Sequence, residues 1–339
     1  MEVAATLFKP LSTGAILCTA CAQACKLAEG ETGLCGIRQV KNGQLMLLVY
    51  ALAAATHIDP VEKKPLYHFL PGSQSFSVGT VGCNFSCAFC QNADISQAPK
   101  GAQGRIFGRE LLPQTAVDLA VQNGCRSISY TYNEPAVFYE YARDTALLAQ
   151  KAGLKNIFVT GGFETRALLD DAAGWLDAMN IDLKSFSDPF YRKICGARLK
   201  PVLETIGYAH AKGIWIELTT LVIEGLNDSD EELTQIARFI AELSPDIPWH
   251  VSGFRPCYQL TDRPATSPQT LHRAYEIGKA AGLNFVYTGN LFDPEHTATP
   301  CPACGFRVIE RSGYLGERVR SFLKQNKCPN CGREIAGLF

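Results

Sequence analysis

Apolar and polar positions along the middle of the chain follow two alternating patterns. Between about residues 74 and 290, short apolar runs rich in β-branched residues alternate with longer stretches of helical spacing. The apolar runs predict strands at residues 76–82, 127–132, 156–160, 178–184, 214–223, 249–254 and 284–289. Consecutive βα units build a parallel sheet with helices outside it. We therefore expect an α/β fold, a partial or full parallel (β/α) barrel.

The predicted helices between these strands have recognisable start and stop residues. Pro135 stands at a first helical position, and Gly153 comes just after the end of the same segment. Gly124 ends the helical stretch that begins near residue 111. The acidic residues 230–232 fall in the first turn of a further helix, where the helix dipole favours negative charge.

The two ends of the chain break this alternation. We expect a cysteine-rich N-terminal segment with short strands at residues 1–72, the barrel at 73–292 and a separate appendage at 293–339. Lys41-Asn42-Gly43 predicts a hairpin turn within the first segment. The longest apolar run, residues 45–56, is shorter than the roughly 20 residues of a membrane-spanning helix, so it predicts a buried strand or helix.

Charge and composition limit the classes of partner that the chain is expected to bind. The chain has 339 residues, with 32 Lys and Arg against 33 Asp and Glu, so no strongly basic surface is expected and nucleic acid is not indicated as a partner. The N-terminal sequence lacks the pattern of a secretory signal, so we expect a cytoplasmic protein with no membrane segment. In that compartment, clustered cysteines favour metal sites over disulfides.

Three of the 14 cysteines lie in one short loop after the first predicted barrel strand. Cys83, Cys87 and Cys90 have the spacing C-x3-C-x2-C. Barrel enzymes place their chemistry on such loops, and three thiolates suit a compact iron–sulfur cluster with one iron left open. The alternative is zinc with a distant fourth ligand, but the C-x3-C spacing differs from the usual zinc knuckle.

Two further sets contain four cysteines each. The C-terminal set forms a pair of C-P-x-C-G knuckles and predicts a closed metal site, either a zinc ribbon or a rubredoxin-like iron site: Cys301, Cys304, Cys328 and Cys331. The N-terminal set has the spacing C-x2-C-x3-C followed by a fourth cysteine: Cys18, Cys21, Cys25 and Cys35. Zinc is our first interpretation of the N-terminal set, and an accessory iron–sulfur cluster that passes electrons inward is the rival. The absence of any metal is the third alternative.

The three-cysteine loop resembles that of the radical S-adenosylmethionine (radical SAM) superfamily. The match includes an aromatic residue, Phe89, directly before the last cysteine. The resemblance implies a [4Fe-4S] cluster on Cys83, Cys87 and Cys90, with S-adenosylmethionine (SAM) bound to the fourth iron. It implies reductive cleavage of SAM to methionine and a 5′-deoxyadenosyl radical, which abstracts a hydrogen from a substrate.

Other segments resemble SAM-binding motifs of the same superfamily. Asn133 and Glu134, in Y-N-E-P, occupy the place of a GGE-type motif that contacts the SAM amino group, although both glycines are absent. Asp182 and Lys184 match the D-x-K motif of glycyl-radical-enzyme activases, which holds the SAM carboxylate. Thr219, late in the fifth strand, is a candidate ribose or carboxylate contact, as is the neighbouring Thr220; ordinary strand threonines are the alternative.

The chain departs from the activases at two positions. Those enzymes have an acid before the turn that follows strand three, whereas this chain reads V-T-G-G at residues 159–162. After strand six, Arg255 stands where a related family often has histidine. The resemblance therefore implies neither a cation site at the first position nor a histidine role at the second.

The order of motifs over nearly the whole chain resembles the AmmeMemoRadiSam system radical SAM enzymes (AmrS), relatives of pyruvate formate-lyase activase. This resemblance implies a ferredoxin or flavodoxin as reductant, Memo-like and AMMECR-like partner proteins, and a protein or peptide substrate. It also implies that Lys63, Lys64 and His68 contact the site mouth or a partner. Methyl or aminocarboxypropyl transfer, and a non-catalytic metal-binding scaffold, are the alternative functions.

Overall fold

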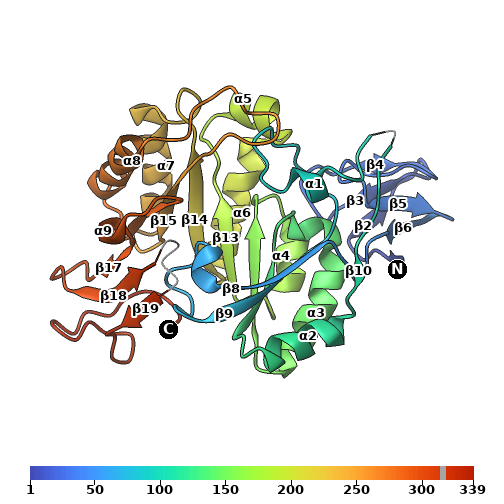
Figure 1. Ribbon diagram of the computed structural model, residues 1–339. Coiled ribbons are helices and arrows are strands. Elements are labelled where there is room, and N and C mark those ends of the chain that lie inside the picture. Colours follow the sequence, from blue (N-terminus) through green and yellow to red (C-terminus); the bar gives the residue numbers. More distant parts are fainter. Residues whose placement is uncertain (102, 314–317) are drawn as a thin grey trace.

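One large sheet forms the centre of the molecule. In the computed structural model, which describes residues 1–101, 103–313 and 318–339, this sheet has eight strands in the order β16-β15-β14-β13-β12-β11-β9-β8 (Figure 1). All pairs from β9 to β16 are parallel. Their bounds are β9 Gln74–Gly79, β11 Ser127–Tyr130, β12 Lys155–Thr160, β13 Ala178–Asp182, β14 Trp215–Val222, β15 Trp249–Gly253 and β16 Val286–Gly289. Each predicted strand is confirmed to within a few residues.

Helices connect the parallel strands and lie outside the sheet (Figure 1). The longer ones are α2 Pro113–Gln122, α3 Tyr139–Lys151, α4 Arg166–Ala172, α6 Leu199–Ala211, α7 Asp230–Leu243 and α8 Pro268–Ala280. Shorter helical turns are η1 Val61–Lys63, α1 Ala93–Ser96, η2 Pro135–Phe138, α5 Asp188–Phe190, η3 Tyr191–Cys195 and α9 Pro294–Thr297. None of the helices in the described residues is long and apolar enough to cross a bilayer.

Helix α7 illustrates how the sequence fixes these elements. The hydroxyl of Ser229 accepts a hydrogen bond from the backbone N–H of Glu232 and caps the first turn, as predicted for a helix that begins here. Leu233, Ile236 and Ile240 are fully buried and recur at helical spacing, so they form the stripe that packs on the sheet.

The barrel is partial. Strand β8, Ala55–Pro60, pairs antiparallel with β9 and forms one edge of the sheet. Within the described residues β16 is the other edge, so the sheet does not close on itself.

The N-terminal region adds small antiparallel sheets beside helices α3 and α4 (Figure 1). Their strands are β1 Val3–Ala4, β2 Phe8–Pro10, β3 Ile16–Cys18, β4 Lys26–Leu27, β5 Arg38–Lys41, β6 Gln44–Leu47, and β7 Leu52–Ala53 paired with β10 Arg109–Glu110. Asn42 and Gly43 both have positive φ angles, 52° and 72°, and connect β5 to β6. The hairpin predicted at this place is confirmed.

A three-stranded sheet near the C-terminus lies on the opposite side of the molecule (Figure 1). Its strands are β17 Thr299–Pro300, β18 Arg307–Ser312 and β19 Arg318–Ser321. Cys301, Cys328 and Ile309 form one buried cluster with Phe285 and Tyr287 at the end of the barrel sheet. The C-terminal ribbon is therefore packed against β16.

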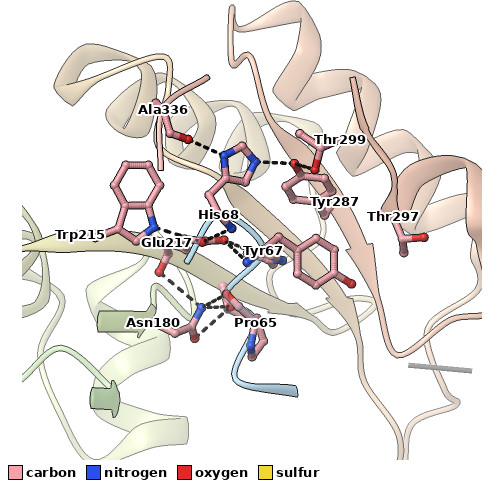
Figure 2. Close-up of polar contacts among 12 residues, drawn as sticks. Pro65, Tyr67, His68, Asn180, Trp215, Glu217, Tyr287, Thr297, Thr299 and Ala336 are labelled. Carbon is pink, nitrogen blue, oxygen red and sulfur yellow. Dashed lines mark hydrogen bonds and ion pairs between the residues drawn. The ribbon is translucent and has the colours of Figure 1, made fainter. Parts of the chain in front are cut away.

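A buried polar network holds the ribbon, the barrel and the segment after η1 together (Figure 2). The Glu217 carboxylate on β14 accepts hydrogen bonds from the backbone N–H groups of Tyr67 and His68, at 2.9 and 2.7 Å. His68 Nδ1 lies 2.7 Å from the Ala336 carbonyl, which can only accept, so Nδ1 donates and Nε2 accepts from the Tyr287 hydroxyl at 2.6 Å. Burial lowers the pKa of His68 to about 4, which keeps this tautomer neutral.

Candidate active site

The three-cysteine loop follows β9 at the carboxyl-terminal edge of the parallel sheet. Cys83, Cys87 and Cys90 are free thiols and line one cavity of about 420 Å³. The backbone N–H of Phe85 donates to Cys83 Sγ over 3.4 Å, and the hydroxyl of Ser96 lies 3.2 Å from Cys90 Sγ. Donors directed at sulfur favour the thiolate form that binds metal.

The thiols of this loop are held in a low-dielectric setting. Burial raises the pKa of Cys83 to about 12. A hydrogen bond with the buried Cys195 and burial itself raise the pKa of Cys87 well above its usual value. A bound metal reverses this preference, because its positive charge deprotonates the coordinating thiol.

Two side chains fix the path of the loop. Asn133 Nδ2 donates to the carbonyl of Gly82 at 2.6 Å and to the hydroxyl of Thr80 at 3.1 Å. Lys100 Nζ donates to the carbonyl of Phe85 at 2.5 Å. Asn133 therefore lines the cavity but uses its amide group to anchor the cysteine loop.

Gly161, after β12, lets the loop approach the sheet. A Cβ atom at this position would lie 2.5 Å from a ring carbon of Phe85, which is closer than real Cβ contacts come. The Phe85 ring also packs edge-on against Phe163, with centroids 5.0 Å apart. Glycine at position 161 of the V-T-G-G turn is thus required for the packing of Phe85, which lies between the first two cysteines of the loop.

The structure brings the predicted cofactor-binding residues to one place. All of them line the same cavity as the three thiols: Phe89, Asn133, Glu134, Asp182, Lys184 and Thr219. They come from the ends of β9, β11, β13 and β14 or from the segments that follow, which a parallel sheet places along one edge.

Lys184 and Asp182 form an ion pair in this cavity. Lys184 Nζ lies 2.6 Å from Asp182 Oδ2, and the lysine side chain is only 11% exposed. Although burial opposes it, the Asp182 carboxylate and the nearby thiols raise the pKa of Lys184 well above its usual value. The cavity therefore holds a fixed positive charge beside a carboxylate, suited to a ligand with both an acidic and an amino group.

Glu134 belongs to a buried proton-sharing group. Glu134 accepts a hydrogen bond from the backbone N–H of Gly161 at 2.9 Å and contacts the hydroxyl of Thr160. Glu164 contacts the same hydroxyl at 2.6 Å. A hydroxyl has one proton to donate, so one of the two acids must carry a proton. Burial raises the pKa of both acids, and the charge of Glu134 raises that of Glu164 further, well above its usual value, so the shared proton is favoured on Glu164.

The two candidate threonines of β14 point to different surroundings. Thr219 lines the cavity and its hydroxyl contacts the side chain of Asn180 at 2.9 Å. The hydroxyl of Thr220 donates to the carbonyl of Leu183 at 2.8 Å and accepts from Trp249 at 2.9 Å. Thr220 thus has the structural role of an ordinary strand threonine, which was the alternative interpretation of this residue.

A second cavity, of about 430 Å³, adjoins the first. The two share Lys63, Lys64, Tyr132, Ser252 and Asn290 in their walls. A third and more open hollow, of about 850 Å³, also reaches Tyr132. The three spaces therefore meet at one residue.

Tyr132 itself has an unusual backbone. Its φ angle is +71°, which is uncommon for a bulky residue, and its hydroxyl lies 3.0 Å from His57 Nδ1. Strained residues of this kind cluster at functional sites. The sequence contained Tyr132 within Y-N-E-P, but it gave no signal for a role at the junction of the cavities.

Comparison with known proteins identifies the family. The sequence profile of the Radical SAM superfamily matches residues 77–240, which contain the cysteine loop, Glu134 and Lys184. Relatives named pyruvate formate-lyase 1-activating enzyme and putative glycyl-radical enzyme activating enzyme match 48% and 54% of the chain. The chain belongs to the radical SAM superfamily.

Three individual proteins show how far the similarity extends. Uncharacterized protein MJ0808 of Methanocaldococcus jannaschii is 40% identical over 332 residues, 98% of each chain. The pyruvate formate-lyase 1-activating enzyme of Escherichia coli K12 is 21% identical over 48% of this chain and 66% of its own length. Streptococcus suis SuiB, solved with its precursor peptide SuiA, shares the fold, with a TM-score of 0.51, 15% identity, and coverage of 68% of this chain and 51% of that one.

The residues of this radical SAM protein fit the family's cofactors. Three thiols in one cavity match a cluster with one iron left for another ligand. The ion pair of Lys184 and the buried carboxylate of Glu134 face the same space and match the polar ends of SAM.

The residues expected to contact the site mouth or a partner lie in different surroundings. Lys63 and Lys64 line both cavities, and both bind the carboxylate of Asp59, at 3.0 and 2.9 Å. The expectation that His68 contacts the site mouth or a partner is wrong, because His68 is 0% exposed and its ring is used in the network with Tyr287.

The radical SAM site also contains residues that the sequence did not indicate. Glu164 supplies the acid that the V-T-G-G turn lacks, but from a position after the turn. His272, Asp293 and His296 come together with their ligand atoms within 4.8 Å of one another. Asp293 also lines the second cavity.

The C-terminal cysteines of this radical SAM protein are spaced for one metal ion. Cys301 Sγ and Cys331 Sγ lie 3.6 Å apart, Cys304 Sγ and Cys328 Sγ lie 3.7 Å apart, and all four sulfurs lie within 4.8 Å of one another. A tetrahedral ion with metal–sulfur bonds of about 2.3 Å requires this spacing. Zinc and iron both fit this geometry.

Proposed function

We propose that the protein is a radical SAM enzyme that cleaves SAM reductively and abstracts a hydrogen atom from a protein or peptide residue. The observation that carries the proposal is the gathering of three thiols, the Asp182–Lys184 pair and Glu134 around one cavity at the carboxyl-terminal edge of the sheet. When bound and reduced, the [4Fe-4S] cluster supplies the electron that breaks the C5′–S bond of SAM, giving methionine and a 5′-deoxyadenosyl radical.

The residues of the chain orient SAM and exclude water. In our proposal Lys184 holds the SAM carboxylate, and Asp182 keeps the lysine side chain in place. The ionised Glu134 accepts from the SAM ammonium, while the protonated Glu164 and the hydroxyl of Thr160 fix its orientation. Thr219, at the opposite wall, contacts the ribose or the carboxylate.

The second cavity is the proposed substrate site. It opens from the first at Tyr132 and is lined by charged side chains from three parts of the chain, including Lys63, Asp59 and Arg311. Such a surface suits a peptide segment with polar backbone groups better than an apolar metabolite. The third hollow, which also reaches Tyr132, gives an extended chain a second way out.

The proposed partners follow from the chemistry and from the AmrS resemblance. A cluster of this kind needs a low-potential one-electron donor, so we propose a ferredoxin or flavodoxin. The relatives described as activating enzymes support a protein substrate. Memo-like and AMMECR-like partners stay a prediction, which affinity capture from an anaerobic extract, followed by reconstitution with the separate proteins, would test.

The test is anaerobic turnover of SAM. Protein reconstituted with iron and sulfide is reduced with dithionite and given SAM, and the products are separated chromatographically. The proposal expects 5′-deoxyadenosine and methionine from the wild-type protein and none from Cys87→Ala. The matched control is Cys125→Ala, because Cys125 is buried but lines none of the described cavities.

Other products would contradict the proposal in distinct ways. Methylthioadenosine would indicate aminocarboxypropyl transfer, and S-adenosylhomocysteine would indicate methyl transfer. Intact SAM in the presence of a full cluster would favour the metal-binding scaffold.

A further inference from the structure

The N-terminal cysteines surround a fourth and smaller cavity. Cys18 ends strand β3, Cys25 precedes β4 and Cys35 precedes β5, and all of these line the cavity together with Cys21. Three of the four are buried. Residues distant in sequence complete the wall, among them Asn84 of the active-site loop.

The spacing of these sulfurs differs from that of the C-terminal ribbon. In the ribbon the four sulfurs all lie within 4.8 Å of one another, as one tetrahedral ion requires. Among the described residues, the N-terminal sulfurs do not form such a group, and neither do those of Cys83, Cys87 and Cys90. A cubane cluster holds its thiolates on four separate irons, so they stand farther apart than around a single ion. Neither cysteine set therefore has the spacing of a single tetrahedral ion.

Two buried hydrogen-bond donors at the cavity have no acceptor among the residues that the structure describes. Arg38 is 2% exposed; its Nε donates to the carbonyl of Val137 and its Nη2 to Glu140, but Nη1 has no acceptor. Asn84 is also 2% exposed, and its Nδ2 has no acceptor. Leaving a buried donor unsatisfied costs about 1–3 kcal/mol. Both side chains line the cavity, so an anionic group with several acceptors there would satisfy them.

We propose that Cys18, Cys21, Cys25 and Cys35 bind a second [4Fe-4S] cluster, with Arg38 and Asn84 donating to its sulfur atoms. Four cysteine ligands leave no open iron, so this cluster binds no SAM and can only transfer electrons. We thus prefer the accessory iron–sulfur cluster, the rival interpretation made from the sequence, over zinc. The identity of the cluster does not depend on the proposed function, whereas the relay described next does.

The two cysteine loops are in direct contact. Asn84, which lines the N-terminal cavity, is the residue directly after Cys83. Gln23 donates to the carbonyl of Asn84 at 2.8 Å. A Cβ atom on Gly82 would lie 2.7 Å from the carbonyl oxygen of Cys35, and the positive φ of +91° at Gly82 also favours glycine.

This contact supports a one-electron relay. A low-potential electron-transfer protein reduces the N-terminal cluster by one electron, and this cluster then passes the electron to the cluster on Cys83, Cys87 and Cys90. No bond forms or breaks in the relay, and no proton moves. The N-terminal cluster returns to its oxidised state and is ready for the next electron.

The deciding experiment removes the active-site cluster and measures what remains. The variant Cys83→Ala/Cys87→Ala/Cys90→Ala is purified anaerobically, reconstituted and analysed for metals and acid-labile sulfide. The proposal expects about four iron atoms and four sulfides per chain, beyond any ribbon metal. Electron paramagnetic resonance after reduction should give a signal that SAM does not change. Zinc in place of iron, or iron without sulfide, would overturn the proposal.

A second variant tests the ligands and the relay. Cys21→Ser/Cys35→Ser should lose about four irons, yet still release 5′-deoxyadenosine with dithionite, which can reduce the active-site cluster directly. With a flavodoxin as the reductant the release should fall by at least about tenfold. Retention of all the iron would contradict the ligand assignment. If this variant does not fold, the metal content of the first variant decides alone.

The unpartnered donors provide an independent readout. In the variant lacking the active-site cysteines, Asn84→Ala should shift the midpoint potential of the remaining cluster to a more negative value, because hydrogen bonds to sulfur stabilise the reduced state. An unchanged potential would remove Asn84 from the proposed site. This readout does not depend on SAM cleavage, so it separates failure of the N-terminal cluster from failure of the proposed enzyme activity.

Discussion

Lys184 Nζ lies 2.6 Å from Asp182 Oδ2, at the wall of the cavity that contains the three active-site thiols. The two residues flank Leu183 directly after β13, and the side chain of Lys184 is far less exposed than that of Asp182, 11% against 37%. The buried cation thus has only one acidic partner at hydrogen-bonding distance among the described residues, which leaves it able to bind a second carboxylate.

We expect Lys184→Met to weaken SAM binding by about 10- to 100-fold, since a hydrogen bond to a charged group contributes about 1.5–3 kcal/mol. Anaerobic calorimetric titration of the reconstituted protein measures the affinity. The matched control is Lys155→Met, which removes an ion pair with Asp177 of similar length, 2.7 Å, at the opposite end of the sheet. Equal affinity in the two variants would exclude Lys184 from the SAM site.

Gly161→Ala should displace the cysteine loop, because the added methyl group would occupy the space of the Phe85 ring. We expect a lower yield of active-site cluster, measured as SAM-dependent change in the electron paramagnetic resonance signal. Gly174→Ala is the control, since a Cβ at Gly174 meets no atom within 4 Å. A normal signal in Gly161→Ala would mean that the loop tolerates the shift.

Glu164→Gln should change the pH dependence of stability. The pKa of Glu164 is raised from 4.5, mainly by burial and then by Glu134. The folded state thus binds this proton more tightly than the unfolded state. The stability that the bound proton contributes is complete below the unfolded pKa near 4.5 and is lost as the pH rises toward the folded pKa. The midpoint of thermal unfolding should therefore fall with rising pH more steeply in the wild type than in Glu164→Gln. Parallel curves would contradict the assignment of the proton.

Glu217→Gln should change the pH dependence of stability in the opposite direction. Burial opposes ionisation, but the hydrogen bond from His250 and the nearby donors lower the pKa of Glu217 below 4.5, so its contribution is present above that pH and is lost as pH falls. The carboxylate accepts from Tyr67 and His68 in the network of Figure 2. We expect a loss of about 2–4 kcal/mol in the free energy of unfolding at pH 7. Glu242→Gln, on the exposed face of α7, should have no comparable effect.

Removal of the ribbon metal should disturb the second cavity as well as the ribbon. Arg311, on β18, donates to the carbonyl of Tyr67 at 2.6 Å, and its guanidinium lies 4.1 Å from the centre of the Tyr67 ring. Both residues line the second cavity. We expect Cys301→Ser to lose one metal ion per chain and to lower the melting temperature, with metal analysis and calorimetry as the measurements. Unchanged metal content would exclude the four-cysteine site.

The strands could be predicted because a parallel sheet covered on both sides leaves near-continuous apolar runs in the sequence. Strand β15 is buried at every position, from Trp249 to Gly253. The cysteine sets could be predicted because ligand spacing within one loop is a local property. The sequence also indicated Asp182 and Lys184, which adjoin the end of a strand.

Contacts made over long distances in sequence could not be predicted. Glu164 and Glu134 meet at the hydroxyl of Thr160, and the turn between them carries no acidic residue at the usual place. Arg311 contacts a residue 244 positions earlier in the chain. The family resemblance assigned His68 to the site mouth or a partner, whereas the packing of the C-terminal segment buries it.

Electron–nuclear double resonance on the reduced protein, with SAM labelled at its amino nitrogen and carboxylate oxygens, tests the central claim most directly. The account predicts coupling of these labelled atoms to the cluster bound by Cys83, Cys87 and Cys90, and loss of the coupling in Cys87→Ala. A reduced cluster whose spectrum shows no coupling to labelled SAM, at concentrations that saturate binding, would contradict it.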